Sequence, residues 1–314
     1  MALNIGLDLF GGDYAPLCNL EGLKLVLERQ PDIKVTVFGD EALVRPLTKE
    51  HPYKERIHIV HAPDKIDMGD SPMRSVISKP NSSIIQGLNY LKRGLIDGFA
   101  SAGNTGAIFG ASVIILGAVL ENVRPCLMTH VPRPHDPDAI ILDIGANADV
   151  KPETLADFAL LGDAYCRHVL NIEQPRVALV NIGEEPEKGN ELTKAAYRLF
   201  QQDGRFRFVG NAEPDKLFRD LADVYVCSGF AGNLILKLSE ALVEIVKRLG
   251  FKHPYLDRFN YENLGGSPVL GVNGAVVIGH GISNASAIAN MLLRCREIAS
   301  SALHKKIKQA FQQA

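Results

Sequence analysis

The sequence lacks the signature motifs of several common enzyme classes. It has no Walker A loop of the form G-x-x-x-x-G-K-[ST], which disfavours P-loop nucleotide hydrolysis. Its one approach to a dinucleotide fingerprint is Gly279-His280-Gly281, where Asn284 replaces the third glycine and too little chain follows for a second βαβ half. No G-x-S-x-G elbow occurs, and no cysteine lies in a nucleophile setting. These absences turn attention away from bound nucleotides and covalent protein intermediates.

The chain also lacks a charge imbalance, paired cysteines and a long apolar run. Its formal net charge of -2 over 314 residues argues against a nucleic-acid-binding surface. The five cysteines are odd in number and include no Cys-x-x-Cys pair, so neither a disulfide framework nor a zinc site is indicated. We expect no metal and no cofactor. The longest apolar stretch, 107–120, is too short to span a bilayer and contains Ser112, which favours a buried helix.

The first residues do not follow the pattern of a signal peptide. Leu3–Asp8 already has the composition of a strand, with no basic start and with an acid where the apolar region should run. We therefore expect a protein of the reducing cytoplasm.

Apolar runs of strand length alternate with amphipathic stretches of helical length. This alternation predicts an α/β fold, with a doubly wound, mostly parallel sheet and helices on both faces. We expect one domain over residues 1–314, with two lobes around one crevice as a variant, and the three-proline segment Val131–Asp138 as a surface loop between two halves. The expected strands are Leu3–Asp8, Ile33–Phe38, Ile57–Val60, Gly98–Ala100, Ile140–Ile144, Arg176–Ile182, Phe206–Val209, Val224–Cys227 and Ala275–Ile278. The expected helices include Cys18–Arg29, Ser82–Arg93, Pro152–Val169 and Asn190–Gln202.

Four turns that combine glycine with asparagine lie where an expected strand passes into a helix. Glycine lets backbone N–H groups approach a ligand closely, and a helix N-terminus presents those groups with a partial positive charge. Ligands of parallel sheets bind outside the carboxyl ends of the strands, where all these turns fall. Together with Gly11-Gly12 they predict an anion-binding crevice and chemistry on a phosphate or similar oxyanion. The turns are Ser101–Gly106, Gly183–Asn190, Gly229–Asn233 and Gly279–Asn284.

Charged residues near these turns have functional and structural interpretations. Asp8 and Asp13 lie around the first turn, and Asp143 and Asp149 lie around Gly145-Ala146-Asn147. Helix capping or loop hydrogen bonding explains each of them at least as well as catalysis. Lys188 precedes a helix start whose dipole favours anions, and a solvated surface lysine is an equal alternative. His280 lies between two glycines at a strand end, where it would reach the crevice or serve as a structural hydrogen-bonding residue.

A long amphipathic helix is expected over Leu234–Leu249. Its apolar residues recur on one face at helical spacing, with the charged residues off that face. The pattern fits a core helix, a dimer helix or a membrane-surface helix, and the first two are the more common.

In order along the chain, these motifs resemble the bacterial phosphate acyltransferase family, the acyl-[acyl carrier protein]:phosphate transacylases of phospholipid synthesis. Each motif is weak alone, but their joint occurrence over nearly the whole chain is specific. The matching stretches are Asp8–Pro16, Ser101–Ala107, Arg124-Pro125, Leu142–Asn147, Asn181–Gly183, Lys188–Leu192, Gly210-Asn211, Gly229–Asn233, and Gly265–Pro268 through to Gly279–Gly281.

The resemblance implies a fold like that of the isocitrate and isopropylmalate dehydrogenases and phosphotransacetylase. It implies that inorganic phosphate attacks the thioester of an acyl carrier protein, so that no protein nucleophile is needed. Lys188 and Asn233 match the family's catalytic positions, as a positive charge and an amide for the developing oxyanion. The candidate substrate- or phosphate-binding residues are Gly11, Gly12, Asp13, Ser101, Gly103, Asn104, Thr105, Gly106, Asn147, Asn190, Gly232 and His280.

The partners that the resemblance implies are acyl carrier protein, inorganic phosphate and a second copy of the chain, with no nucleic acid. Because an acyl phosphate is poorly soluble, we also expect functional coupling to a membrane glycerol-3-phosphate acyltransferase. Weak peripheral contact with the inner face of the membrane would serve that coupling.

The sequence departs from the family pattern at two places. Ser228 stands where the family usually has an aspartate, and the helical hairpin at 234–264 is shortened. A coenzyme A-dependent phosphotransacetylase stays open as an alternative, because it would share the fold and the stabilisation of an oxyanion. The serine at position 228 favours a non-catalytic anion-sensing regulatory protein of the same fold, whereas the intact Lys188 and Asn233 argue against it. An NAD-dependent dehydrogenase is disfavoured because the dinucleotide fingerprint is incomplete.

Overall fold

The computed structural model describes residues 2–134 and 137–312, which form two compact units. Unit 1 contains the residues up to Ala118 together with Tyr261–Ala302, and unit 2 contains Val119–Asn260 together with the residues from Leu303 onward. The expectation that Val131–Asp138 separates two halves is wrong. That segment connects two strands inside unit 2, and its residues 135 and 136 lie outside the described residues.

Unit 1 is built on a mostly parallel sheet in the order β3-β2-β1-β4-β11-β10. All neighbours are parallel except β10 and β11, which pair antiparallel. The strands are β1 (Leu3–Asp8), β2 (Ile33–Gly39), β3 (Ile57–His61), β4 (Gly98–Ser101), β10 (Ser267–Leu270) and β11 (Ala275–Ile278).

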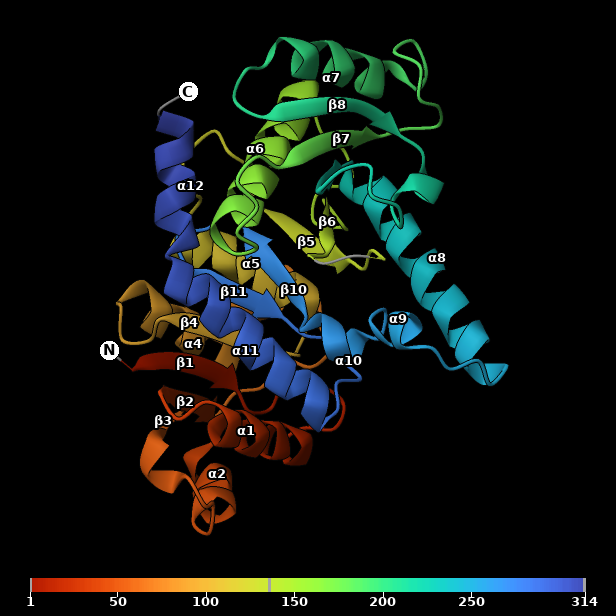
Figure 1. Ribbon diagram of the computed structural model, residues 1–314. Helices are drawn as coiled ribbons and strands as arrows, with labels where there is room; N and C mark the ends of the chain where they lie inside the picture. The colour runs from red at the N-terminus through yellow and green to blue at the C-terminus, as the bar shows by residue number, and fades with distance from the viewer. Residues whose placement is uncertain (1, 135–136, 313–314) are drawn as a thin grey trace. The chain divides into compact units, whose positions relative to one another are not determined.

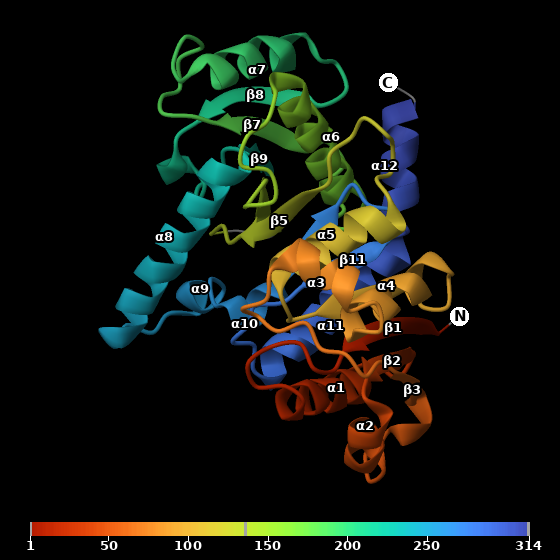
Figure 2. The same cartoon turned by 180° about the vertical axis from the view of Figure 1, so that it is seen from behind.

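Helices cover both faces of this sheet. In Figure 1, α1 and α11 lie in front of the strands of unit 1, and α3, α4 and α5 come to the front in the reverse view of Figure 2. The helices of unit 1 are α1 (Leu17–Arg29), α2 (Glu41–Thr48), α3 (Pro72–Ser78), α4 (Ser83–Lys92), α5 (Thr105–Leu116), α10 (Tyr261–Leu264) and α11 (Ala285–Ser301), with the 3-10 turn η1 (Lys54–Arg56).

Unit 2 repeats this architecture with a smaller sheet in the order β5-β6-β9-β7-β8. The four strands from β6 to β8 in that order are parallel, and β5 pairs antiparallel with β6. The strands are β5 (Cys126–Val131), β6 (Ala139–Leu142), β7 (Arg176–Val180), β8 (Arg207–Ala212) and β9 (Val224–Val226). The helices are α6 (Pro152–His168), α7 (Glu191–Gln202), α8 (Gly229–Arg248), α9 (Pro254–Asp257) and α12 (Leu303–Gln312), with the 3-10 turn η2 (Pro214–Lys216).

The predicted α/β class, with mostly parallel strands, is confirmed. All nine expected strands form, with ends that differ by a few residues, and the sequence analysis missed β5 and β10. The chain passes from β1 to β2 and β3 on one side and then returns to place β4 on the other side of β1. The ends of β1 and β4 therefore flank a topological switch point, the usual place for a ligand in such sheets.

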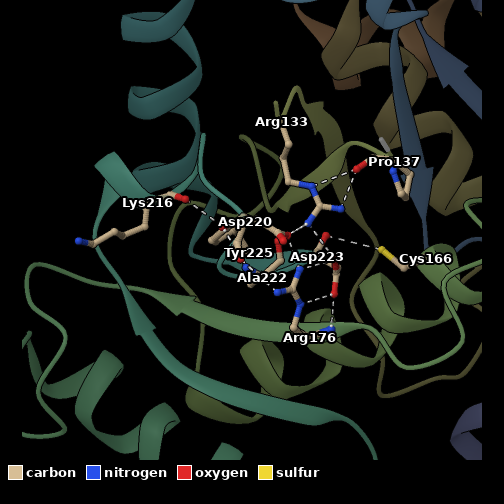
Figure 3. Close-up of polar contacts among 9 residues, drawn as sticks. All are labelled: Arg133, Pro137, Cys166, Arg176, Lys216, Asp220, Ala222, Asp223 and Tyr225. Carbon is tan, nitrogen blue, oxygen red and sulfur yellow. Dashed lines mark hydrogen bonds and ion pairs between the residues drawn. The ribbon is translucent and has the colours of Figure 1, made fainter. Parts of the chain in front are cut away.

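The amino edge of unit 2 is fixed by a partly buried network of arginines and aspartates, drawn in Figure 3. Asp223, just before β9, accepts hydrogen bonds from Arg133 Nη1 at 2.9 Å and from Arg176 Nε at 3.0 Å, and Arg176 also bonds Asp220. Burial by itself would raise the pKa of Asp223, but these hydrogen bonds outweigh it and hold the pKa below its ordinary value. The network ties together the ends of β5, β7 and β9, opposite the edge that carries the Gly/Asn turns.

Asp157 on α6 titrates at an unusual pH. Burial raises the pKa of Asp157 to about 6, against the pull of Arg205, and the charges of Asp203 and Glu153 add to the rise. Its pKa in the unfolded chain is the lower one, so stability is lost as the pH rises from about 4 to about 6, and the penalty persists above that range.

We expect Asp157→Asn to increase the free energy of unfolding at pH 7.5 by about 1 kcal/mol, a figure reduced because the side chain is only partly buried. At pH 4 the gain should nearly vanish. Urea unfolding of both proteins at the two pH values measures this, with Glu21→Gln on the exposed face of α1 as the control amide substitution. An equal effect at both pH values would contradict this reading of Asp157.

Candidate functional site

The predicted site residues fall into two groups, one at the carboxyl edge of each unit. In unit 1 they follow β1, β4 and β11, and in unit 2 they follow β6, β7 and β9. All four Gly/Asn turns lie at strand-to-helix junctions, as predicted.

The turn after β1 packs against the turn after β11. Asp13 donates its backbone N–H to the Gly281 carbonyl at 2.8 Å, and Gly12 has a φ of +102°, which a side chain would strain. A Cβ at Gly11 would lie 2.5 Å from Asp8 Oδ2. The half-buried His280 is part of the same junction, and its carbonyl accepts the Ser283 hydroxyl.

Asp8 organises the turn after β4. Its buried carboxylate accepts the Ser101 hydroxyl at 2.6 Å, and Ser101 Oγ in turn accepts the Gly103 N–H at 3.0 Å. Burial raises the pKa of Asp8, and hydrogen bonds from Ser101, Ser83 and backbone N–H groups oppose that rise. The Ser101 hydroxyl is thus committed to holding the turn.

Asn104 is an N-cap and a loop anchor. Its Oδ1 accepts the Ala107 N–H at 3.0 Å, and its Nδ2 donates to the carbonyls of Asp67, Met68 and Asp70. The next two residues are exposed at the start of α5, and across the described residues their backbone N–H groups have no hydrogen-bond partner. These residues, Thr105 and Gly106, are the open donors of unit 1.

In unit 2 a single carboxylate gathers the loop after β6. Asp143 is fully buried and accepts backbone N–H groups from Leu127, Gly145, Ala146 and Asn147, at 2.6 to 3.2 Å. The Asn147 side-chain amide donates one hydrogen bond to the same carboxylate and a second to the Pro125 carbonyl, so both its amide hydrogens are used structurally.

Helix α8 begins directly against this loop. Ser228 is its N-cap and accepts the Ala231 N–H, while the Gly229 N–H donates to the Asn147 carbonyl at 2.8 Å. A Cβ at Gly232 would overlap the Asp143 carbonyl oxygen. The predicted binding residue Gly232 is therefore required for close packing, whatever its role toward a ligand.

Asn233 differs from the other asparagines of the Gly/Asn turns. Asn104, Asn190 and Asn284 each cap a helix through the side-chain oxygen. Asn233 lies one turn inside α8, exposed beside Gly145, and within 2–134 and 137–312 its amide has no hydrogen-bond partner. In the first turn of α8, the Phe230 N–H also has no hydrogen-bond acceptor among those residues.

Lys188 lies in the turn between β7 and α7. Its side chain is exposed, and the described part of the chain provides it with no ion pair. Since β9 lies between β6 and β7 and all three are parallel, the Lys188 turn and the start of α8 share one edge of the sheet. In Figure 1 the arrowheads of β7 and β8 point to the side from which α8 starts.

The remaining sequence features offer no other chemistry. Burial raises the pKa of four thiols, those of Cys126, Cys166, Cys227 and Cys295, which disfavours the reactive thiolate. Among the described residues no group of three or more His, Cys, Asp or Glu side chains is arranged to hold a metal ion. No helix in those residues is long and apolar enough to cross a membrane.

Sequence reasoning underrated three buried polar residues at this edge, Asp143, Asn181 and Asn211. Asp143 and Asn181 directly follow β6 and β7, and Asn211 is the next-to-last residue of β8. A buried polar residue at such a position has to find partners in the neighbouring turn. Their place inside the motifs was visible, but their roles were not.

The chain is similar to known proteins over nearly its full length. Residues 3–254 match the family described as "Fatty acid synthesis protein". Phosphate acyltransferase of Dictyoglomus thermophilum is 38% identical, covering 97% of this chain and 96% of that protein. The Salinibacter ruber phosphate acyltransferase is also 38% identical, with coverage of 99% and 98%.

Solved structures with the same fold are more distant in sequence. EutD phosphotransacetylase from Staphylococcus aureus has a TM-score of 0.63 at 17% identity, covering 95% of this chain and 94% of its own. A branched-chain phosphotransacylase from Enterococcus faecalis has a TM-score of 0.64 at 13% identity, covering 95% and 99%. At these identities the structures establish the fold, and the full-length sequence matches establish the family. The chain belongs to the phosphate acyltransferase family.

Proposed function

We propose that this protein transfers the acyl group of an acyl carrier protein thioester to inorganic phosphate, and that the acyl phosphate is used in phospholipid synthesis. A phosphate oxygen attacks the thioester carbonyl carbon, and the tetrahedral intermediate expels the carrier's sulfur. The proton of the attacking hydrogen phosphate ends on that sulfur, which leaves acyl phosphate and the free carrier thiol. The full-length similarity to phosphate acyltransferases supports this reaction.

The site assignment rests on two polar side chains at one sheet edge of unit 2, neither of which has a hydrogen-bond or ion-pair partner among the described residues. Within 2–134 and 137–312, Lys188 has no carboxylate counter-ion and the Asn233 amide has no hydrogen-bond acceptor. An amide, the Phe230 N–H and the positive end of the α8 dipole suit a developing oxyanion. Lys188 suits either that oxyanion or the attacking phosphate.

In unit 1 the donors best suited to a phosphate are Thr105 and Gly106, with the positive end of the α5 dipole behind them. Ser101, Gly103 and Asn104 support them by shaping the turn. The proposal also includes the residues of the two turns beside the one after β4, namely Gly11, Gly12, Asp13 and His280.

Helix α8 offers the apolar surface for an acyl chain, a second copy of the chain or a membrane. Five apolar residues of its stripe are each more than half exposed: Leu234, Leu238, Leu242, Ile245 and Leu249. The core-helix alternative is therefore wrong for this helix. Of the nearby basic residues, Arg248 and Arg258 are paired with Glu244 and Asp138. Lys247 and Lys252 are exposed and have no ion pair among the described residues.

A coenzyme A-dependent reaction is the competing assignment, because the structural relatives include phosphotransacetylases. Formation of acyl phosphate from acyl-carrier protein, but not from acyl-coenzyme A, supports the carrier-dependent reaction. The reverse preference would overturn it.

Lys188→Ala and Asn233→Ala should each lower kcat about a hundredfold or more, the scale for losing one contact to an oxyanion. Acyl phosphate release from acyl-carrier protein measures this, and Lys194→Ala on α7 is the matched control that should retain activity. Trapping a covalent acyl-enzyme during turnover would refute the direct attack by phosphate.

Ser228→Asp should change kcat no more than about threefold, because the position is the N-cap of α8 and aspartate caps equally well. Ser228→Ala should lower the free energy of unfolding by about 1 kcal/mol through loss of that cap. Steady-state kinetics measure the kcat of Ser228→Asp, and urea unfolding measures the stability of Ser228→Ala. A large gain from Ser228→Asp would mean that an acid is needed there and would favour the regulatory alternative.

The exposed stripe predicts a homodimer that binds anionic membranes weakly and in a salt-sensitive way. Leu238→Glu with Leu242→Glu should yield monomer in equilibrium sedimentation and abolish co-sedimentation with anionic liposomes at low salt. Ile77→Glu, at an even more exposed apolar position in unit 1, should do neither. Liposome binding that survives high salt, or a wild-type monomer, would contradict this assignment.

A further inference from the structure

The β7–β8 ladder contains one extra residue on β8. Val177 pairs with Phe208 and Leu179 pairs with Asn211, so three residues of β7 oppose four of β8. The irregularity includes Gly210, which has a φ of +107° and open space where a Cβ would be, so its backbone conformation alone demands glycine. Successive side chains of a strand point to opposite faces, and the extra residue therefore reverses the face from which Asn211 projects.

Asn211 joins Asn181 in a buried pair at the ends of β8 and β7. Asn181 Nδ2 donates to Asn211 Oδ1 at 3.2 Å, and both residues are almost fully buried. The pair also binds two backbone carbonyls of the turn between β7 and α7. Asn211 Nδ2 donates to the Glu185 carbonyl at 2.9 Å, and Asn181 Nδ2 donates to the Lys188 carbonyl at 3.1 Å. We call Asn181 and Asn211 the asparagine clamp.

The same turn is fitted closely around Lys188. The Lys188 backbone N–H donates to the Glu185 carbonyl at 3.1 Å, and the Lys188 carbonyl accepts from Asn181, so the peptide groups on both sides of Lys188 are fixed. A Cβ at Gly183 would lie 2.7 Å from Lys188 Cγ, so the lysine stem lies along a glycine. Gly189 has a φ of +97°, and a Cβ there would overlap Asn181 Oδ1.

We propose that Asn181 and Asn211 are positioning residues, which act through Lys188 by fixing the backbone from which its ammonium group extends. The inference rests on the proposed role of Lys188. A lysine stem has many rotamers, so only a fixed backbone and a fixed stem direction keep its charge at one place near the reacting atoms. The clamp also explains why Asn181-Ile182-Gly183 and Gly210-Asn211, which contain no reactive group, belong with the other motifs.

Asn211→Ala removes the hold on Glu185 and should lower kcat about tenfold to a hundredfold, with little change in the KM for acyl-carrier protein. Asn211→Asp keeps the size of the side chain and the acceptor for Asn181 but loses the donor to Glu185. It should show the same fall in kcat, and it serves if the alanine variant folds poorly. In a Lys188→Ala background, either substitution should cause no further loss, because both act through the same ammonium group.

Asp203→Ala is the control for a merely structural effect, because it breaks the Arg205 ion pair near the amino end of β8 in the same unit. It should lower the Tm without the fall in kcat. The positioning role would be overturned if an Asn211 substitution lowered kcat as much in the Lys188→Ala background as in the wild type. It would also be overturned if Asp203→Ala lowered kcat together with the Tm, because the fall in kcat would then follow from lost stability. Normal kcat in both Asn211 variants, beside an impaired Lys188→Ala, would overturn the clamp and leave the proposed function intact. An active Lys188→Ala would instead remove the lysine from the proposed function itself.

Discussion

The carboxylate of Asp143 is the interaction on which the functional edge of unit 2 depends. It collects four backbone N–H groups and the Asn147 amide in a fully buried position, where each unpaired donor would be strongly unfavourable. The loop so formed is the surface against which α8 starts, with contact so close at Gly232 that no side chain fits. The location of Asn233 follows from this packing. Unit 1 contains a smaller version, in which Asp8 holds Ser101.

At these edges, residues that stabilise the turns differ from residues that can bind a substrate in whether their side chains already have hydrogen-bond partners. Asparagine recurs in the Gly/Asn turns chiefly because its side chain caps the following helix, as Asn104, Asn190 and Asn284 do. Asn233 and Lys188 stand apart because the described residues give their side chains no partner. Polar groups that already hold the turns together are not free for a ligand, so donors without a partner are the groups left for a substrate.

The sequence predicted the fold class well because buried parallel strands and amphipathic helices have distinct periodicities. It missed β5 and β10, the two strands that run against the direction of the other strands of their units. β10 is only four residues long, with Pro268 inside it, and proline is an unfavourable strand signal. The three prolines of Val131–Asp138 indicated a boundary, yet the segment only connects β5 to β6, because proline marks turns of every kind.

By itself the sequence determined the alternation of strands and helices, the turns that hold the glycines and the family, since each depends on local pattern or on similarity along the chain. Tertiary structure decided what each polar residue does. The Ser101 and Asn147 side chains support loops, and the Asn233 amide has no hydrogen-bond partner among the described residues. The bulge at Gly210 directs Asn211 toward the Glu185 carbonyl, in the turn that contains Lys188. These outcomes depend on which donors and acceptors meet across strands far apart in sequence, and such pairings have no signature in the order of residues.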